Sequence, residues 1–446
     1  MTTKGGAREA LERSLDVIER DGERLNAFVT VAPEAAREAA EAADRAAAEG
    51  RWLGLLHGMA MAVKDNIETA GLRTTSGSTF FENHVPNDDA AVVARLRRAG
   101  AVIVGKAMLH ELCFGIRSVN PVSGQCRNPW NTERVPGGSS GGSAAALAAG
   151  MVEGALGSDT GGSVRLPASI CGVSGLRPTV GRVPNHGATP VSATFDTIGP
   201  MARRVEDVAR ILAVIAGPDR RDPISIDRPL ENFLPGLGDG IAGVRVGVPG
   251  NFYFDDLADD IAEPVMAAVR ELERHGAELV EVDVPGAEET HLHATVMIFS
   301  DACAYHAERL SERPEGFSKD VYDRMTNGWR YSAVDYARAL RAREAWRRSL
   351  ADLFERVDIL VSPTTPSDPP PVVDDRTLLE ATADATRNTY AGGLGAIPGL
   401  SVPCGFSAAG LPVGLQLEAA WWREPLLLRA GVAYQSATEW HLARPG

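Results

Sequence analysis

The sequence predicts an α/β fold in which helices cover both faces of a large, mostly buried β-sheet. Two observations support this prediction. Short apolar runs of strand length alternate along the chain with longer segments of helical character, which is typical of such folds. The chain also has 446 residues, of which 44% are hydrophobic, enough for a sizeable core. No apolar run reaches the roughly 18 residues of a membrane-spanning helix.

The N-terminal part is expected to begin with two helices. They span Ala7–Glu19 and Pro33–Ala48, and the second is so rich in Ala and Glu that we expect an exposed cover. The apolar run Met59–Val63 predicts a short strand that leads into a loop. A helix at Ala90–Ala99 and a buried strand at Val102–Val104 are expected next.

The same alternation continues to the C-terminus. The expected strands are Val244–Val248, Leu279–Val284, Ile359–Val361, Leu400–Pro403 and Val413–Leu417. The expected helices are Ile261–His275, Ala333–Phe354 and Pro425–Thr438. We predict a single domain over residues 1–446, with composition breaks at Gly217–Gly240 and Pro363–Pro371. The region between them, approximately 241–360, is expected to be a variable lobe or insertion on the same sheet.

Charge and cysteine content restrict the class of protein. A net charge of −14 argues against direct binding of nucleic acid by this chain, although a partner subunit could hold it. Residues Met1–Arg20 carry acidic side chains and no apolar core, so they predict no secretory signal. The widely spaced cysteines are expected to be reduced core thiols in a cytoplasmic protein: Cys113, Cys126, Cys171, Cys303 and Cys404.

Two glycine-cradled serine clusters provide the strongest chemical signal. They span Gly137–Ser143 and Gly157–Ser163, are joined by a helix-forming Ala-rich segment, and follow an isolated lysine, Lys64. Together they supply hydroxyl nucleophiles, an amine base and backbone N–H donors. Those are the groups needed to attack an amide carbonyl.

The second cluster is suited to stabilising an oxyanion. Glycines let the backbone approach a ligand closely, so the N–H groups of Thr160, Gly161, Gly162 and Ser163 are candidate donors beside the Ser163 hydroxyl. Each such donor is typically worth about 3 kcal/mol in the transition state. Asp159 is a natural acceptor for holding this loop in shape.

Lys64 is the candidate base. It follows an apolar stretch, and burial lowers the pKa of a lysine from its usual value of about 10.4 toward neutrality. Asp65 is adjacent, but successive side chains of an extended chain point to opposite faces, so it need not pair with Lys64. A close pairing of the two would keep Lys64 charged and weaken the hypothesis.

These residues resemble the amidase signature family, whose hydrolases use a Ser–cis-Ser–Lys triad. The intervals between Lys64, Ser139 and Ser163 are similar to that family's. The resemblance implies a large mixed sheet, with Ser163 as the acyl-forming nucleophile, Ser139 as a proton relay behind a cis Gly138–Ser139 bond, and Lys64 as the base. Ser140 and Arg165 match supporting positions. Further similar stretches are Lys64–Ile67, Asn128–Trp130, Cys171–Thr179, Ser401–Gly405 and Gly410–Gln416.

Two other chemistries are considered. Gly138–Gly142 also fits G-x-S-x-G, which would make Ser140 the nucleophile of an α/β-hydrolase esterase. That motif needs a preceding strand, whereas Asn131–Pro136 predicts a turn, and it needs a downstream histidine such as His186 or His441. A phosphate-binding loop is disfavoured because neither cluster ends in Gly-Lys-Ser/Thr.

Within the family, the segment Met108–Ile116 resembles stand-alone hydrolases more than the glutaminase-like subunit of tRNA-dependent amidotransferases, which stays open as the alternative. The expected partner is a small-molecule amide, and a homodimer is left open. The mechanism implies no cofactor and no metal. His291 and His293 would share one strand face, but no ligand pattern completes a metal site. Phe299–Tyr305, Tyr322–Trp329 and Trp421–Trp422 are candidate pocket segments, although packing is the commoner role of the tryptophan pair.

Overall fold

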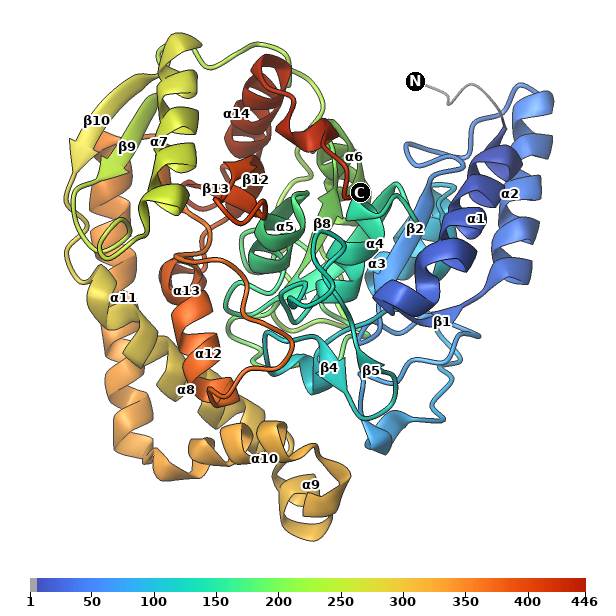
Figure 1. Cartoon of the computed structure of the whole chain (residues 1–446), viewed down its shortest axis with the longest axis horizontal. Coiled ribbons are helices and arrows are strands. Elements are labelled where there is room, and N and C mark those ends of the chain that lie inside the picture. The colour runs from blue at the N-terminus through green and yellow to red at the C-terminus, as the bar shows by residue number, and fades with distance from the viewer. Residues whose placement is uncertain (1–5) are drawn as a thin grey trace.

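The computed structural model describes residues 6–446, so residues 1–5 of the segment considered for a secretory signal lie outside the described residues. Within the described part, eleven strands form one mixed sheet (Figure 1). In sheet order the strands are β1 (Phe28–Val31), β3 (Val102–Ala107), β2 (Ala60–Lys64), β6 (Gly154–Asp159), β8 (Thr197–Ala202), β7 (Ser174–Arg177), β12 (Gly399–Phe406), β13 (Pro412–Glu418), β11 (Ile359–Pro363), β9 (Arg245–Pro249) and β10 (Glu278–Val282). A separate ribbon pairs β4 (Val119–Asn120) with β5 (Gly124–Gln125).

Helices surround this sheet, with the N-terminal pair α1 and α2 at one end and β9 and β10 at the other (Figure 1). The helices are α1 (Ala7–Leu25), α2 (Pro33–Ala48), α3 (Ala91–Arg98), α4 (Gly141–Ala148), α5 (Arg165–Cys171), α6 (Val205–Ile215), α7 (Asp259–Arg274), α8 (Thr290–Tyr305), α9 (Ala307–Glu312), α10 (Lys319–Met325), α11 (Ala333–Arg356), α12 (Leu378–Ala385), α13 (Arg387–Gly395) and α14 (Glu424–Ala437). The α/β fold expected from the sequence is therefore confirmed.

Strand β2 explains why the sheet is buried on both faces. Met61 and Val63 belong to the hydrophobic core that contains α3, α6, α7 and α14. Ala60 and Ala62 belong to a second core, which contains α1, α2, α4 and α5. Because successive side chains of a strand point to opposite faces, both faces need apolar residues, and the strand is a continuous apolar run.

The order of the strands brings two chemically important loops together. β2 pairs in parallel with β3 on one side and with β6 on the other, and Val63 lies opposite Leu156. The carboxyl ends of parallel neighbours lie at the same edge of a sheet. Lys64 at the end of β2 therefore lies beside Ser158 and Asp159 at the end of β6.

Most expected elements are present with small shifts of their ends. The helix at Pro33–Ala48 has both expected bounds and packs on the sheet through an alanine stripe, whereas the first helix continues to Leu25. The prediction for His291 and His293 was wrong, because they lie on α8 rather than on a strand. From the segment 241–360, β9 and β10 extend the same sheet, with β9 parallel to β11. Whether this segment is an insertion stays a prediction.

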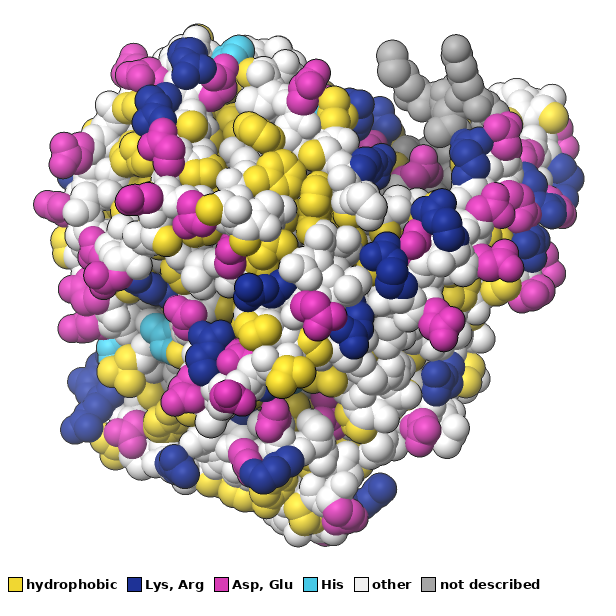
Figure 2. All heavy atoms as spheres, in the orientation of Figure 1, with side chains coloured by type: hydrophobic (Ala, Val, Ile, Leu, Met, Phe, Trp, Pro, Cys, Tyr) yellow, Lys and Arg dark blue, Asp and Glu magenta, His cyan; other side chains and the backbone are white. Residues whose placement is uncertain are grey.

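The distribution of surface charge and the burial of the cysteines agree with what the composition predicted. Lys/Arg and Asp/Glu side chains intermingle over the visible face of the molecule, without a large basic patch there (Figure 2). No helix among the described residues is long and apolar enough to span a membrane. Cys113, Cys126, Cys171, Cys303 and Cys404 are all buried and free.

Candidate active site

Lys64 lies at the centre of a buried hydroxyl cluster. Its side chain is inaccessible to solvent, and its Nζ lies 2.7 Å from Ser139 Oγ. The same Nζ lies 2.9 Å from Ser158 Oγ and 3.3 Å from the carbonyl oxygen of Ser158. The structure thus brings together two residues expected from the sequence, Lys64 and Ser139, and adds Ser158 as a third.

Asp65 does not pair with Lys64. Its Oδ2 accepts hydrogen bonds from the backbone N–H and the hydroxyl of Thr75 instead. Burial lowers the pKa of Lys64, although Cys113, Asp159 and Asp196 oppose this shift. The lowered pKa favours the neutral amine, which is the form that accepts a proton.

Ser139 and Ser140 lead into helix α4. The Gly138–Ser139 peptide bond is cis, as expected from the sequence. Ser140 Oγ lies 3.3 Å from both the carbonyl oxygen and the amide nitrogen of Ser158, and the Ser140 amide donates to the carbonyl of Ser163 at 3.3 Å. Ser140 thereby ties the first serine cluster to the second. Between β5 and Ser140 the described chain has only turns and isolated bridges, so the strand that the α/β-hydrolase alternative requires immediately before Ser140 is absent there.

The carboxylate of Asp159 holds the second serine cluster in place by accepting hydrogen bonds from backbone N–H groups in it and directly after it. Arg177 lies 2.8 Å and Arg165 3.2 Å from its carboxylate, and all three side chains are fully buried. Burial alone would raise the pKa of Asp159, but the two guanidinium groups hold it well below its usual range. Arg165 also donates to Gln416 at 3.0 Å and to Glu418 at 3.2 Å. Asp159 and Arg165 are therefore joined in one buried ionic network.

The loop Thr160–Ser163 differs from expectation in one donor. The Gly162 N–H donates to Asp159 Oδ1 at 2.8 Å, so it is engaged in holding the loop. In the described part of the chain, the backbone N–H groups of Thr160, Gly161 and Ser163 donate to no acceptor. A Cβ on Gly161 would lie 2.2 Å from Tyr390 Cε1, so only glycine fits there. Three of the four expected donors are free to bind a ligand oxygen.

Ser163 lines a small cavity of about 30 Å³ beside this loop. Its hydroxyl forms no hydrogen bond within residues 6–446, and the nearest link to the first cluster is its carbonyl, which accepts from the Ser140 amide. Catalytic hydrogen bonds of free enzymes often form only when substrate binds. The remaining lining residues are Cys113, Phe114, Gly115, Ile116, Thr160, Gly161, Val191, Ile298, Arg324, Thr382, Thr386 and Tyr390.

Arg324 places a buried cation in this cavity. Its guanidinium lies 4.3 Å from the ring centroid of Phe114 and donates to the Phe114 carbonyl at 2.7 Å. Within residues 6–446, its Nε has no hydrogen-bond partner and the guanidinium forms no ion pair with a carboxylate. Burial lowers the pKa of Arg324, while Tyr390 beside it opposes the shift. A buried cation without an anion is costly unless a ligand supplies one.

Several of these residues were missed or misjudged from the sequence. Ser158 belongs to the second serine cluster, and its position at the end of a buried strand could have marked it as a site residue. Cys113 was expected to be a core thiol, yet its Sγ lies 3.9 Å from Ser158 Oγ. Arg324 falls inside the pocket segment Tyr322–Trp329, but nothing in the sequence distinguished it.

The other pocket segments fit less well. Ile298, one residue before Phe299–Tyr305, lines the cavity, whereas Phe299 packs behind it against Phe114 at 5.2 Å. Trp421 donates to the Gly395 carbonyl at 2.9 Å, and Trp422 packs against Arg182, so this pair does not line the cavity. Among the described residues, no group of three or more His, Cys, Asp or Glu could hold a metal ion.

Comparison with known proteins agrees with this geometry. The family model described as Amidase matches residues 9–428. The amidase of Pseudomonas putida is 42% identical over 98% of this chain and 94% of its own length. A glutamyl-tRNA(Gln) amidotransferase subunit of Roseiflexus sp. (strain RS-1) is 40% identical over 95% of this chain and 91% of its own.

A solved structure is also similar. One chain of a vestigial protein complex that reveals the evolutionary origins of an s-triazine catabolic enzyme superposes with a TM-score of 0.92. It is 35% identical and covers 99% of this chain and 97% of its own. The chain therefore belongs to the amidase signature family, and it is an amide-hydrolysing enzyme.

Proposed function

We propose that this protein acts without partner subunits as a hydrolase of small amides, through a Ser163 acyl-enzyme. Ser163 attacks the amide carbonyl, Ser139 takes its proton, and Lys64 receives the proton from Ser139. The same groups then return a proton to the leaving nitrogen, and water releases the acid from Ser163. No cofactor or metal takes part in these steps.

The observation that carries the proposal is the 2.7 Å contact between Lys64 Nζ and Ser139 Oγ in a fully buried site. An amine can act as a base only when it is neutral, and burial favours that form. The neighbouring Asp65 accepts hydrogen bonds from Thr75 and forms none with Lys64, so it does not hold the proton on this amine.

Three backbone donors support the acyl-transfer step. The N–H groups of Thr160, Gly161 and Ser163 are unoccupied in the described chain, whereas the Gly162 N–H is bound to Asp159. Donors that are fixed before the reaction stabilise the developing oxyanion without a reorganisation cost. The network of Asp159, Arg165 and Arg177 fixes them because it holds both ends of the loop.

Arg324 narrows the class of substrate. Arg324 lines the same small cavity as Ser163, and its Nε has no hydrogen-bond partner among the described residues. We therefore propose that the acyl part of the substrate is compact and carries a negative charge, such as a carboxylate. A carboxylate would form a charge-assisted hydrogen bond with the guanidinium and remove the cost of its burial.

The second candidate is the glutaminase-like subunit of an amidotransferase. It is favoured by the relatives at 40% identity that are named as subunits of such an enzyme. The stand-alone function is favoured by the resemblance of the segment Met108–Ile116 to stand-alone hydrolases and by the 42% identical amidase. Both candidates share the same acyl-enzyme chemistry.

The purified chain alone tests the proposal. We expect it to release ammonia or amine from small carboxylate-bearing amides, with neutral amides as matched comparisons. Activity on a range of amides without any partner supports the stand-alone hydrolase. Activity restricted to glutamine, and greatly raised by the other amidotransferase subunits, would instead favour the subunit role. Absence of activity in both settings would contradict the proposal.

A further inference from the structure

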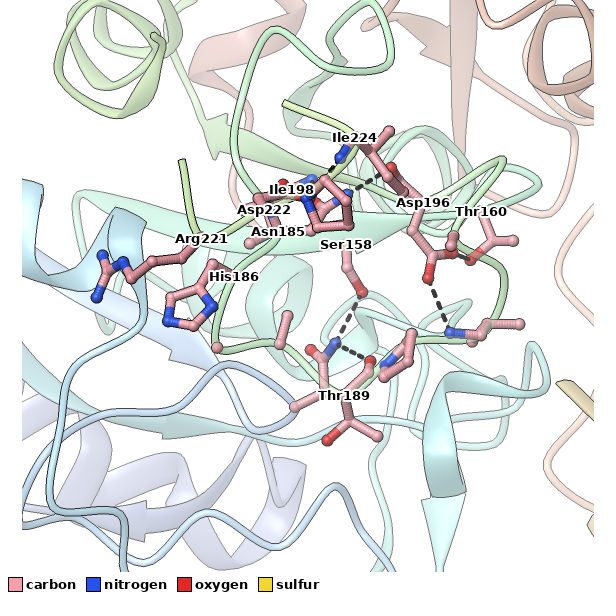
Figure 3. A pocket seen from close by; sticks show the side chains of 17 residues that line it. Ser158, Thr160, Asn185, His186, Thr189, Asp196, Ile198, Arg221, Asp222 and Ile224 are labelled. Carbon is pink, nitrogen blue, oxygen red and sulfur yellow. Dashed lines mark hydrogen bonds between the residues drawn. The ribbon is translucent and has the colours of Figure 1, made fainter. Parts of the chain in front are cut away.

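A second cavity, of about 260 Å³, lies behind the proposed catalytic groups. In Figure 3 it runs from Arg221 and His186 at one end to Ser158, Thr160 and Asp196 at the other. Arg221 is exposed, so that end is the mouth of the cavity, whereas Ser158 and Thr160 form its inner end. We refer to this space as the rear chamber.

The rear chamber adjoins the site at two places. Thr160 and Val191 line both the rear chamber and the small cavity that contains Ser163, so the two spaces adjoin at these residues. Ser158, at the inner end, lies 2.9 Å from Lys64 Nζ through its hydroxyl. The chamber therefore lies on the side of the site from which the proton reaches the leaving group.

Asn66 gives the inner end an unused acceptor. Its side chain is only 2% exposed, and its Nδ2 donates at 3.3 Å to both Ser158 Oγ and the Thr189 carbonyl. Its Oδ1 has no hydrogen-bond partner among the described residues. Leaving a buried amide oxygen unpaired is destabilising, and a ligand that donates an N–H would remove this cost.

The remaining polar groups at this end also suit a donor. The carboxylate of Asp196 accepts from Thr160 Oγ1 and from the amides of Val191 and Ser192, and it lines the chamber with lone pairs to spare. The charge is the reverse of that in the small cavity, where Arg324 supplies a cation. The inner end of the rear chamber and the small cavity thus carry opposite charges, while Arg221 lies at the mouth of the chamber.

We propose that the rear chamber is the subsite for the leaving group and that it selects compact amines, whose N–H it binds. The inference rests on the proposed function, because it assigns the two sides of the scissile bond to two cavities. When the C–N bond breaks, the proton taken from Ser163 passes through Ser139 and Lys64 to the nitrogen. The free amine then donates to Asn66 Oδ1 and leaves by the mouth near Arg221.

The reverse reaction provides the test. Hydroxylamine that occupies the rear chamber attacks the acyl-enzyme, forms a C–N bond and breaks the ester to Ser163, whose oxygen regains a proton through the same relay. The products are a hydroxamate and the free serine. The measured quantity is the ratio of hydroxamate to free acid as the hydroxylamine concentration rises, with the amide that the purified chain hydrolyses fastest.

Two substitutions narrow the chamber without touching the proposed catalytic groups. Ala188→Leu fills its wall, and Ala193→Phe fills it from an exposed position where a larger side chain does not disturb the core. We expect a ratio that rises with hydroxylamine in the wild-type protein, and a slope of this rise that falls by about tenfold in either variant because a small ligand loses its space. Ala409→Leu, on an exposed turn far along the chain, is the matched control and should keep the wild-type ratio.

The outcomes separate this inference from the proposed function. Wild-type hydrolysis with a ratio whose dependence on hydroxylamine is the same in both variants would overturn the subsite and leave the acyl-enzyme intact. A wild-type protein that hydrolyses no amide would overturn both. If Ala188→Leu fails to fold, Ala193→Phe decides alone, because its site is exposed.

Discussion

The Nζ of Lys64 lies 2.7 Å from the Oγ of Ser139, although the two residues are 75 positions apart in the sequence. The contact forms because β2 ends beside β6, and the loop leading into α4 crosses the ends of both strands. Ser158, at the end of β6, completes the set of oxygen atoms around the amine. A neutral amine held in this way can accept a proton from Ser139 during catalysis.

The first prediction concerns pH. Activity that depends on neutral Lys64 should rise with pH and level off above the lowered pKa of this lysine, which lies below 10.5. Lys64→Met should lower kcat/KM by about 10²–10⁴-fold and abolish this rise. The measurement is kcat/KM against pH for both proteins.

Lys106 offers a matched control for that experiment. It is also a fully buried lysine, and burial lowers its pKa to about 8, but it donates to Thr69 and Thr74 and contacts neither serine cluster. Lys106→Met should reduce stability and keep the pH profile. A profile lost in Lys106→Met but kept in Lys64→Met would show that Lys64 is not the base.

The second prediction separates the candidate nucleophiles. Ser163→Ala should lower kcat by about 10⁴-fold or more, since removing a nucleophile removes the covalent route. Ser140→Ala removes only hydrogen bonds to Ser158, worth about 1 kcal/mol, so the loss should stay near tenfold. Mass spectrometry of a trapped acyl-enzyme should find the adduct on the peptide that contains Ser163. An adduct on Ser140 would restore the esterase alternative.

The third prediction concerns the buried ionic network. Asp159→Asn leaves Arg165 and Arg177 buried with less compensation, and such losses typically cost about 3–5 kcal/mol of the free energy of unfolding. Urea unfolding measures this change. Because the folded pKa of Asp159 is lowered, its stabilisation is present above its ordinary value of 3.8 and is lost as pH falls below it.

A surface ion pair provides the comparison for Asp159. Lys319 and Asp323 pair on the exposed face of α10, where water screens both charges. Asp323→Asn should leave the unfolding curve nearly unchanged at neutral pH. Equal effects of the two substitutions would show that burial does not govern the Asp159 network.

The fourth prediction addresses Arg324. Arg324→Gln should raise the KM for a carboxylate-bearing amide by about 10- to 100-fold. This factor corresponds to the free energy of one charge-assisted hydrogen bond. The KM for the neutral amide of the same shape should change little. Circular dichroism checks that the variant folds, and Arg324→Lys should recover part of the preference. An equal rise for both amides would mean that Arg324 only packs against Phe114.

Local sequence patterns predicted most elements of this fold. Pro33–Ala48 has the expected bounds because proline starts the helix and a run of Ala and Glu continues it. Met59–Val63 was displaced by one residue, since a buried strand has no periodicity that marks its ends. His291 and His293 were assigned to a strand because alternation over so few residues also occurs on a helix surface.

Some features of the site could likewise be predicted from local sequence, and others could not. Lys64, Ser139 and Ser163 could be named from their motifs, because glycine-rich loops and an isolated lysine after an apolar run carry a chemical meaning of their own. Gly162 shows the limit of that interpretation. Its N–H was expected to face a ligand, but it donates to the carboxylate of Asp159 instead. Only the folded loop determines which acceptor this N–H reaches.

Neighbouring residues alone were enough to establish the fold class, most of the elements and the chemical groups of the site, because these properties depend on short stretches of chain. The tertiary structure determined which of those groups lie in contact. The pairing of β2 with β6 brought Ser158 to Lys64, and the packing of α10 beside Phe114 brought Arg324 to the cavity of Ser163. Such contacts depend on strand order and helix packing between distant segments, which no local pattern encodes.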